Sequence, residues 1–525
     1  MTNTPARWYP VVLRTALIAL GAVLAASAAA SLSWPYIHDS PLMLYAGWHL
    51  AQGAVPYRDL FDMNMPGTYF AMWGLGSVLG WNELGFRVFD LLSVAIVALA
   101  TFAWLRAFGR APAVAASMLF PVWYLAAGPS GSLQREFLAL VPLSVALAVA
   151  ESRWPIAVRS LAAGLLAGAA GLIKPQFLLL AVPAMTYLAW SVAPPERRVR
   201  MIALMVAGVV VPFAATFAFL ASRGGLDPFF DIAFNYWPLY THLTGDHRSI
   251  AGLERLQYLA TSTVGGMWNP WIPLALLGVI AVVRDRRRLG MAWTIAAMLV
   301  AAAVYPALSG QFWSYHWLPF QYVLLCASAL NLGGDAPEQW TAAGVVQATA
   351  AVATLLLTGT TAVTALIAAS TGDPTSDVVR ARARVHGVPH EVAEFLRDHL
   401  RAGDRVQPLD WTGGAVHGML EARAPLATRF MYDFHFYHHV DTPYIARLRR
   451  QFLRQLATTR PRFVIEVSGG RPWPTGPGTT EDFPMLRQLL ESEYRVVREE
   501  ETYRILERIA PGAERQTPGA SNTSE

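Results

Sequence analysis

Residues 11–33 read VVLRTALIALGAVLAASAAASLS and carry a single charged side chain, Arg14. A helix needs about 20 mostly apolar residues to cross the hydrocarbon core of a bilayer, so this stretch is long enough for one crossing. A cleaved signal peptide is the alternative, but its apolar core is usually shorter, and many more apolar runs follow here. We therefore predict an uncleaved first membrane helix.

The composition of the whole chain agrees with a membrane protein. Of the 525 residues, 54% are hydrophobic and only 15% are charged, whereas soluble domains usually carry about 25% charged residues. The net charge of +5 could indicate a nucleic-acid partner, but the arginines lie in short loops between apolar runs, where topology signals are expected. With one cysteine, Cys326, no intramolecular disulfide can form.

Apolar runs of this kind recur along the first 369 residues. We predict eleven membrane helices, at about 11–33, 84–106, 111–128, 136–152, 159–174, 176–194, 200–222, 268–284, 290–308, 318–334 and 342–368. Lys174-Pro175 separates the fifth from the sixth, and a proline there favours a turn, with one kinked helix as the alternative.

Basic residues predict the orientation of these helices. Arg106 with Arg110, Arg153 with Arg159, the arginines at 197–200 and the run RDRRR at 284–288 fall on one side if the helices alternate, and that side should be the cytoplasm. The N-terminus is then cytoplasmic. The loops 34–83, 129–135, 223–267 and 309–317 and the C-terminus lie outside.

From residue 370 the composition changes. EVAEFLRDHLRAGDRV predicts an amphipathic helix followed by a strand, RFVIEVSGG a buried strand, and YRVVREEETYRIL a β-hairpin. We expect a small α/β domain over 370–510 and a disordered tail over 511–525. The predicted fold class is thus an α-helical polytopic membrane protein with a small extracytoplasmic α/β domain.

The first outer loop is unusually rich in ionisable groups. Ser40 and Pro41 predict a helix start, and Gly53 predicts its end. An apolar stripe from Leu44 to Trp48 would lay this helix on the membrane surface. A second apolar stretch, PGTYFAMWGLGSVLG, is too short for a comfortable crossing.

Three acids of this loop are candidates for chemistry: Asp39, Asp59 and Asp62. Each has a simpler explanation, because Asp39 suits a helix N-terminus and the other two could pair with Arg58 or face water. Basic groups on the same outer side change the balance, since ionisable residues at membrane depth are costly and usually functional. These groups are Arg58, Arg87, Arg135, Lys174 and His316, and Glu136 follows Arg135.

A carboxylate beside cations at a membrane edge suits transfer of a group from a lipid phosphate. The carboxylate can act as general base, and the cations, or a metal ion, can stabilise the leaving phosphate. The chain has no GxxxxGK[ST] loop, no GxGxxG opening a helix and no HExxH. ATP is therefore not expected as the energy source. A divalent metal ion stays open as a cofactor.

The order of these segments resembles the polytopic C-type glycosyltransferases (GT-C fold) of the protein-O-mannosyltransferase and aminoarabinose-transferase kind. The similar segments are the acid opening the first outer loop, GAVPYRDLFDMNMPGTYFAMWGLGSVLGWNELGFRVF, GLIKPQFLLLAVP and SYHWLPF. Two features depart from the family pattern. Ser40 follows the first acid where an Asp-Glu pair is common, and Asn64-Met65-Pro66 replaces the Lys-Pro-Pro of the aminoarabinose branch.

The resemblance implies a polyprenyl-phosphate sugar donor and inverting transfer to a lipid, glycan or protein hydroxyl outside the cytoplasm. It implies Asp39 as the catalytic carboxylate, with Asp59 or Asp62 as a secondary acid. Candidate contacts to the donor phosphate are Arg58, Arg87, Arg135, Lys174 and His316. The expected location is the inner (plasma) membrane, with no nucleic-acid partner.

Other features have open interpretations. Trp34, Trp48, Trp73 and Trp81 fit an aromatic membrane belt better than sugar stacking. The loop 227–247 could cover the cavity or pack on the surface. Asp433 with His435, His438 and His439 could bind a metal, but an exposed loop is favoured. Two other functions compete with the transferase: a lipid or polysaccharide transporter or flippase, which usually shows internal repeats, and a non-enzymatic assembly protein.

Overall fold

The computed structural model describes residues 8–283, 289–333, 342–469 and 471–509. The chain forms two compact units, Met1–Gly387 and Val388–Glu525. The boundary lies later than the predicted one, because helix α17 (Asp377–His386) belongs to the first unit. The Asp377 carboxylate accepts hydrogen bonds from the Ser130 backbone N–H at 2.8 Å and from its hydroxyl at 2.7 Å. These contacts tie α17 to the short helix η2 (Pro129–Gly131).

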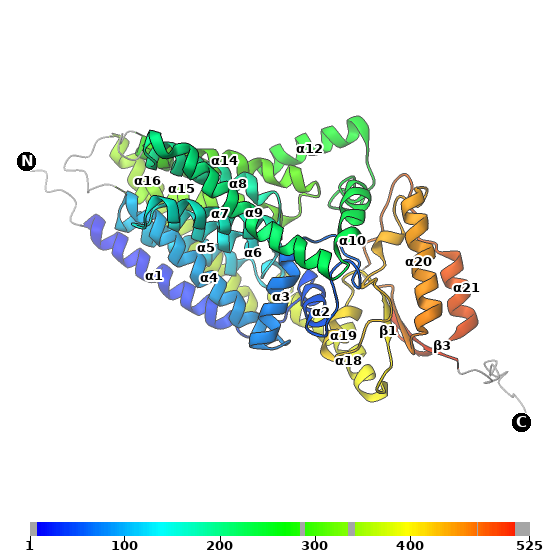
Figure 1. Ribbon diagram of the computed structural model, residues 1–525. Helices are drawn as coiled ribbons and strands as arrows, with labels where there is room; N and C mark the ends of the chain where they lie inside the picture. Colours follow the sequence, from blue (N-terminus) through cyan, green and yellow to red (C-terminus); the bar gives the residue numbers. More distant parts are fainter. Residues whose placement is uncertain (1–7, 284–288, 334–341, 470, 510–525) are drawn as a thin grey trace, which may run out of the picture. The chain divides into compact units, whose positions relative to one another are not determined.

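Each of the eleven predicted apolar ranges contains a helix (Figure 1). They are α1 (Trp8–Ser31), α4 (Glu83–Leu105), α5 (Arg110–Ala126), α6 (Arg135–Ala150), α7 (Ile156–Ile173), α8 (Phe177–Tyr187), α9 (Arg198–Ser222), α13 (Trp271–Val283), α14 (Leu289–Ser309), α15 (Leu318–Ala329) and α16 (Ala342–Thr371). The predicted turn at Lys174-Pro175 is confirmed, since α7 ends before it and α8 begins after it. The run at 284–288 and the tail from 510 lie outside the described residues.

Within the described residues, six helices are long and apolar enough to cross a membrane by length and composition, and the chain is a multi-pass membrane protein. These helices are α1, α4, α7, α9, α14 and α16, and the apolar spans of α1, α4, α9 and α16 differ by two or three residues from the helix bounds. Helix α13 forms a pair with α12 (Gly252–Gly266), and the two are bent by 72°. The remaining apolar helices are shorter and complete the bundle.

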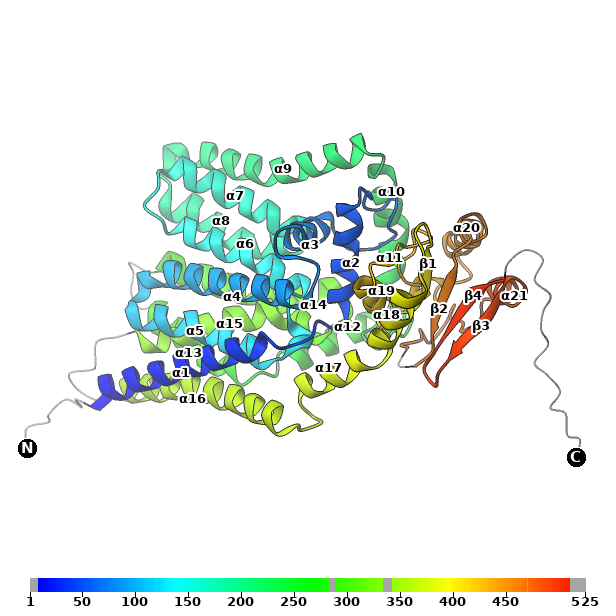
Figure 2. The same cartoon turned by 90° about the horizontal axis from the view of Figure 1, so that it is seen from below.

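Glycines let two of these helices approach closely. A Cβ at Gly164 on α7 would lie 2.2 Å from the Met205 carbonyl oxygen on α9, and a Cβ at Gly208 would lie 2.5 Å from the Leu161 carbonyl oxygen. Helices that cross a membrane associate through such small residues, since lipid offers no hydrophobic driving force between them. Figure 2 shows α7 and α9 running side by side.

The segment 34–83 folds into α2 (Asp39–Ala51) and α3 (Pro66–Leu79), which pack together. Two predictions need correction. Helix α2 begins at Asp39, and no side-chain hydrogen bond caps it; the Ser40 hydroxyl instead donates to the Ser132 carbonyl at 3.4 Å. The apolar stripe is not laid open for a membrane surface, because Leu44 and Trp48 are buried within the protein.

The loop before α12 is also structured. It contains α10 (Leu226–Asp231), a π-helical turn (Ile232–Tyr236) and α11 (Trp237–Tyr240). A short helix, η6 (Ser314–Trp317), joins α14 to α15. The buried side chains of α15, which extend over its whole length, make it the most enclosed helix of the bundle.

The second unit is an α/β domain, as predicted. Its four-stranded sheet has the order β1-β2-β4-β3, with β1 parallel to β2 and the other pairs antiparallel. Its elements are α18 (Val388–His399), β1 (Val406–Leu409), α19 (Ala415–Glu421), α20 (Pro443–Thr459), β2 (Phe463–Val467), α21 (Pro484–Glu493), β3 (Tyr494–Glu499) and β4 (Tyr503–Arg508). The predicted helix, buried strand and hairpin are confirmed at α18, β2 and β3–β4 (Figure 2).

The prediction that the histidine-rich segment at 430–440 is an exposed loop is wrong. Asp433, His435 and His438 are buried, and Asp433 forms an ion pair with Arg471. The Arg471 guanidinium in turn lies 4.0 Å from the centre of the Trp473 ring. Aromatic neighbours enclose this segment, so its polar groups belong to the core of the domain.

Candidate functional site

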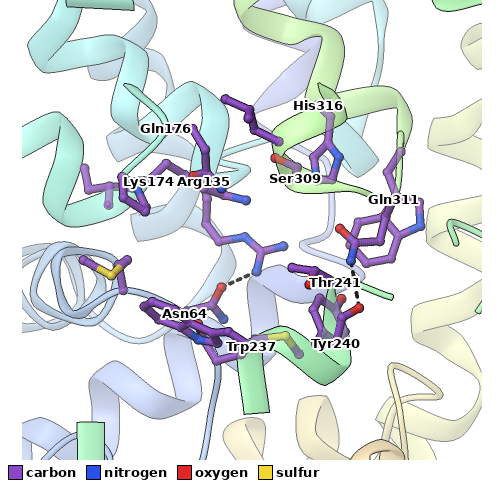
Figure 3. Close-up of a pocket in the computed structure, with 16 residues that line it drawn as sticks. Asn64, Arg135, Lys174, Gln176, Trp237, Tyr240, Thr241, Ser309, Gln311 and His316 are labelled. Atoms are coloured by element: carbon purple, nitrogen blue, oxygen red, sulfur yellow. Dashed lines mark hydrogen bonds between the residues drawn. The ribbon is translucent and has the colours of Figure 1, made fainter. Parts of the chain in front are cut away.

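A cavity of about 150 Å³ lies where segments far apart in the sequence meet in the first unit. One part of its wall is formed by residues 63–65 of the segment between α2 and α3, by Arg135 at the start of α6, and by residues 173–176 at the junction of α7 and α8. Residues of α11 and the segment 308–316 form the rest. Figure 3 shows the Arg135 guanidinium at the centre of these side chains.

Arg135 joins the candidate acid of the first loop to the cavity. Its Nη2 atom lies 2.8 Å from Asp39 Oδ2 and 3.4 Å from the Tyr315 hydroxyl. Its Nη1 atom donates to the amide oxygen of Asn64. Asp39 stands in the first turn of α2, where the helix dipole favours its negative charge. The carboxylate therefore has a fixed cationic neighbour and stays partly accessible, with 19% of its side chain exposed.

The Glu136 carboxylate is a second, fully buried acid beside the cavity. Its Oε1 atom lies 3.0 Å from Lys174 Nζ and 3.6 Å from His316 Nε2, and it accepts a hydrogen bond from the Tyr305 hydroxyl at 3.0 Å. Side chains from α14, from η6 and from the turn before α8 thus converge on Glu136 Oε1, which belongs to α6. This arrangement holds Lys174 at the cavity wall.

Arg87, which we predicted as a phosphate contact, is fully buried away from the cavity lining. Its guanidinium donates to the carbonyl oxygens of Trp34 at 3.0 Å and Pro35 at 2.6 Å, and it lies 3.5 Å from the Asp90 carboxylate. Asp90 accepts a hydrogen bond from the Tyr124 hydroxyl at 2.7 Å. That hydroxyl accepts one from the backbone N–H of residue 133 at 2.8 Å.

This network connects residues 34–35, which precede Asp39, with residue 133, which precedes Arg135. Backbone carbonyl and amide groups buried without partners are costly, so the network fixes both segments. The geometry gives Arg87 the role of a positioning residue.

The other candidates lie at different distances from the cavity. Asp62 is buried and accepts hydrogen bonds from the Met63 N–H at 2.6 Å and from the Asn64 side chain at 3.0 Å, so it orients the loop that lines the cavity. Arg58 and Asp59 form an ion pair at 2.7 Å, with 47% and 37% of their side chains exposed. Arg58 also donates to the Arg223 carbonyl at 2.8 Å. Neither lines the cavity.

No protein-family model and no curated protein matches the sequence. Solved structures do match the fold. The structure of ArnT from Cupriavidus metallidurans bound to undecaprenyl phosphate superimposes with a TM-score of 0.57 at 14% identity, over 97% of this chain and 100% of that one. Its apo state gives 0.57 at 15% identity, over 93% and 97%. The chain has the C-type glycosyltransferase fold.

In this C-type fold the site combines charges of both signs. Burial lowers the pKa of His316 to about 3, although Glu136 acts in the opposite direction, so the imidazole is neutral near pH 7. Burial likewise lowers the pKa of Lys174, and Glu136 raises it. Burial, with the nearby Asp39 charge, holds the pKa of the Tyr315 hydroxyl well above its usual value. The cations that face the cavity are therefore Arg135 and Lys174.

Unusual backbone conformations occur close to the site residues. Three non-glycine residues within two positions of a site residue adopt positive φ angles: His38 (φ 57°), Leu133 (φ 49°) and Phe312 (φ 59°). Such conformations cost about 1–3 kcal/mol and cluster at functional sites. His38 directly precedes Asp39, so one strained residue lies immediately before the candidate acid.

The residues that could hold a metal ion do not gather in one place. Among the described residues, no group of three or more His, Cys, Asp or Glu side chains has the spacing of a metal site. Asp39 and Asp59 instead have arginine partners.

Some site residues were outside the predicted set. The amide and aliphatic hydroxyl side chains that line the cavity are Asn64, Gln176, Thr241, Ser309 and Gln311, and Trp237, Tyr240 and Trp313 are among the aromatic ones. Trp237, Tyr240 and Thr241 belong to the loop 227–247, which the sequence indicates as a possible cover for the cavity, and Asn64 belongs to a segment that is compared with the family pattern. Glu136 could be found from its position beside Arg135 at the start of an apolar run.

Proposed function

We propose that the protein is an integral-membrane glycosyltransferase. It transfers a sugar from a polyprenyl-phosphate donor to a hydroxyl group outside the cytoplasm. The observation that carries the proposal is that Arg135 and Lys174, from separate segments of the chain, line one cavity, with the Asp39 carboxylate 2.8 Å from Arg135. The ArnT structure with the same fold is described as bound to undecaprenyl phosphate, which supports a lipid phosphate as the ligand.

Arg135 and Lys174 would hold the phosphate. Both line the cavity, and their positive charges would stabilise the charge that develops on the phosphate as the sugar leaves. Arginine also matches phosphate through two parallel hydrogen bonds. His316 is neutral and would contribute shape and a hydrogen bond rather than charge.

Asp39 would act as the general base. Its carboxylate would take the proton of the acceptor hydroxyl while that oxygen attacks the anomeric carbon. The bond from the anomeric carbon to the phosphate oxygen breaks in the same step, and polyprenyl phosphate leaves. A single displacement of this kind inverts the configuration at the anomeric carbon.

The position of the site outside the cytoplasm rests on the basic loops. If successive helices alternate in direction, Arg106, Arg153 and Arg159 lie on the side of the membrane opposite to Asp39. Basic residues near helix ends are concentrated on the cytoplasmic side. The second unit would then be extracytoplasmic, where it could contribute to acceptor binding. Localisation to the plasma (inner) membrane belongs to this proposal.

The experiment is transfer by purified protein in lipid nanodiscs. Undecaprenyl-phosphate-linked radiolabelled sugars and a membrane extract that supplies acceptors are added, and labelled product is measured. We expect Asp39→Asn to bind the donor but to lose about 10²- to 10⁴-fold in transfer rate. Asp59→Asn is the matched control and should keep near-wild-type activity, because its partner is the exposed Arg58. Wild-type transfer by Asp39→Asn would overturn the assignment of the base.

A further inference from the structure

A second cavity of the first unit, with a volume of about 330 Å³, lies between α1, α5, α16 and α17 and shares no lining residue with the candidate site. Figure 2 shows α1 and α16 side by side, with α17 following α16. We propose that this cavity binds an anionic phospholipid of the bilayer, with an acyl chain between the helices and the phosphate group at Arg380. This binding does not depend on the proposed transfer reaction.

Two walls of the cavity are helices at the periphery of the membrane bundle. Of the most apolar stretch of each helix, 11% of α1 and 33% of α16 are buried within the protein, compared with 50% of α7 and α14. The surface of α1 and α16 that the protein leaves uncovered therefore meets lipid. Thr361 and Thr364 of α16 line the cavity and are themselves exposed, so the cavity is open at this helix.

The lining has an apolar part and a charged part, as a binding site for an amphiphile needs. The apolar part lies near the C-terminal ends of α1, α5 and α16, and it includes Ala30, Leu125, Ala126, Ala365, Leu366 and Ala369. The charged residues of the lining are Asp377 and Arg380, and both belong to α17. Since α17 follows α16 in the chain, the charges lie where the membrane helices end.

The Arg380 guanidinium is positioned to bind a phosphate group. It donates to the Thr375 carbonyl at 2.6 Å and lies 3.5 Å from Asp377 Oδ1, with 59% of its side chain exposed. The Asp377 carboxylate already accepts two hydrogen bonds from Ser130, at 2.8 and 2.7 Å. Because a guanidinium carries several N–H donors in a planar fork, Arg380 can keep these contacts and still donate to a phosphate oxygen.

A second arginine of α17 lies at the end of α1. Arg382 donates to the Ser33 hydroxyl at 3.0 Å, and it forms no ion pair within the part of the chain that the structure describes. The other acid near this end is Asp373, and its Oδ1 atom accepts hydrogen bonds from the N–H and the hydroxyl of Thr375, both at 2.8 Å. Arginines between the ends of membrane helices recognise anionic lipid head groups, which favours a phospholipid as the occupant.

The walls of this cavity also hold the segments that precede the candidate site residues. Trp34 lines the cavity, and its carbonyl accepts the hydrogen bond from Arg87 on the path to Asp39. Asp377 lines the cavity and binds Ser130 on the path to Arg135. A bound lipid would restrain both segments. We therefore expect occupancy to raise the transfer rate, and this second effect rests on the proposed function.

Lipid binding by the full-length protein, purified in detergent and stripped of lipid, tests the site directly. Phosphatidylglycerol and phosphatidylcholine are the probes, and native mass spectrometry counts the lipid molecules retained. We expect a single phosphatidylglycerol to be retained about tenfold more tightly than phosphatidylcholine, because only its head group carries a net negative charge. Equal retention of the two lipids would overturn the proposal. Displacement of phosphatidylglycerol by inorganic phosphate alone would also overturn it, since the cavity would then bind an anion without its acyl chain.

Two arginine variants test the position of the head group. Arg380→Gln should weaken retention of phosphatidylglycerol by about tenfold and leave phosphatidylcholine unchanged. Arg450→Gln is the matched control, since Arg450 is an exposed arginine of α20 outside the lining, and it should behave as the wild type. Equal retention by the two variants would contradict the assignment of the phosphate to Arg380.

Two phenylalanine variants of α16 test the position of the acyl chain. Ala365→Phe places a ring in the cavity and should lower retention of both lipids, whereas Val363→Phe changes an exposed residue outside the lining and should not. The melting temperature without lipid reports whether each variant is folded. If folded Ala365→Phe retained phosphatidylglycerol as well as Val363→Phe does, the acyl chain would lie elsewhere and the proposal would fail.

Transfer rates separate this proposal from the proposed function. Added phosphatidylglycerol should raise the transfer rate of the wild type several-fold and should have little effect on Ala365→Phe. An equal increase in both proteins would contradict the coupling between the cavity and the site. If the wild type retained the lipid but showed no transfer under any condition, the proposed function would fail and the lipid site would stand.

Discussion

Lys174 is the single lysine of the chain, and its ammonium group lies 3.0 Å from the buried carboxylate of Glu136. The pair connects the turn after α7 to the first turn of α6. A buried charge that loses its partner costs far more than the pair contributes, because the remaining charge cannot be solvated. The stability of the first unit and the position of its cavity-lining cation are therefore coupled through one ion pair.

This coupling predicts different outcomes for stability and activity. Glu136→Gln should lower the free energy of unfolding by up to about 3–5 kcal/mol, because the half-buried Lys174 ammonium then loses its counter-charge. The double variant Glu136→Gln/Lys174→Met should recover much of that stability, since both charges are gone. It should not recover transfer, because the cation proposed to hold the phosphate is missing. Thermal unfolding and transfer rates of the single and double variants measure both effects.

Two outcomes for the double variant would contradict this prediction. If the double variant were as unstable as Glu136→Gln alone, the ion pair would not be the source of the loss. If the double variant transferred sugar at the wild-type rate, Lys174 would not be a phosphate contact.

The buried network around Arg87 predicts a loss of catalytic geometry. Arg87→Leu removes the donors to Trp34 and Pro35 and leaves Asp90 buried and unpaired, at a cost of about 3–5 kcal/mol. Since Trp34 and Pro35 lead into Asp39, the rate of transfer should fall more than donor affinity does. Tyr124→Phe should have a smaller effect of the same kind, about 1–3 kcal/mol, because it removes only one hydroxyl from the network.

A control on the same helix separates position from stability. The Thr101 hydroxyl on α4 lies 2.9 Å from the Tyr322 hydroxyl, outside the network that leads to Asp39. Thr101→Val should lower the melting temperature and leave the ratio of transfer rate to donor affinity unchanged. If Arg87→Leu and Thr101→Val changed that ratio equally, Arg87 would be structural only.

The sequence allowed prediction of the helices because membrane spans need long apolar runs, and each predicted range holds a helix. The predicted topology also placed Asp39, Arg135, Lys174 and His316 at one end of the bundle, because each lies near an end of an apolar run and successive helices alternate in direction. The pairing of Asp59 with Arg58 was one of the alternatives open from the sequence, but only the fold shows that neither residue lines the cavity.

The neutral wall of the cavity was beyond prediction for a different reason. Gln176, Ser309 and Gln311 are isolated polar residues at the ends of apolar runs, where such residues are common. Only the packing of α8 and α14 brings them to one surface. Arg87 shows the same limit, because its partners are backbone carbonyls, which leave no trace in the sequence.

Close packing of α7 on α9 predicts a sharp difference between two glycines. Gly164→Ala would place a methyl group 2.2 Å from the Met205 carbonyl oxygen, so the helices must separate, and the melting temperature should fall by several degrees. Gly359→Ala on α16 is the matched control, since no atom lies within 4 Å of its Cβ position. It should be neutral or stabilising by up to about 1 kcal/mol. Equal melting temperatures for both variants would contradict the close contact.

Acid should destabilise the first unit through His316. The ordinary pKa of histidine is about 6.5, and burial lowers that of His316 to about 3. Between these values the unfolded chain binds a proton that the folded protein does not, so the free energy of unfolding falls as the pH falls below about 6.5. The slope is at most about 1.4 kcal/mol per pH unit from this one group.

Thermal unfolding at pH 7 and pH 5 measures this dependence. The wild-type melting temperature should be lower at pH 5 than at pH 7, and His316→Gln should show a smaller difference, because glutamine does not titrate. His386→Gln is the matched control, since His386 lies on the exposed side of α17, and it should keep the wild-type dependence. Identical pH dependence in His316→Gln and the wild type would mean that folding does not lower the pKa of the His316 imidazole.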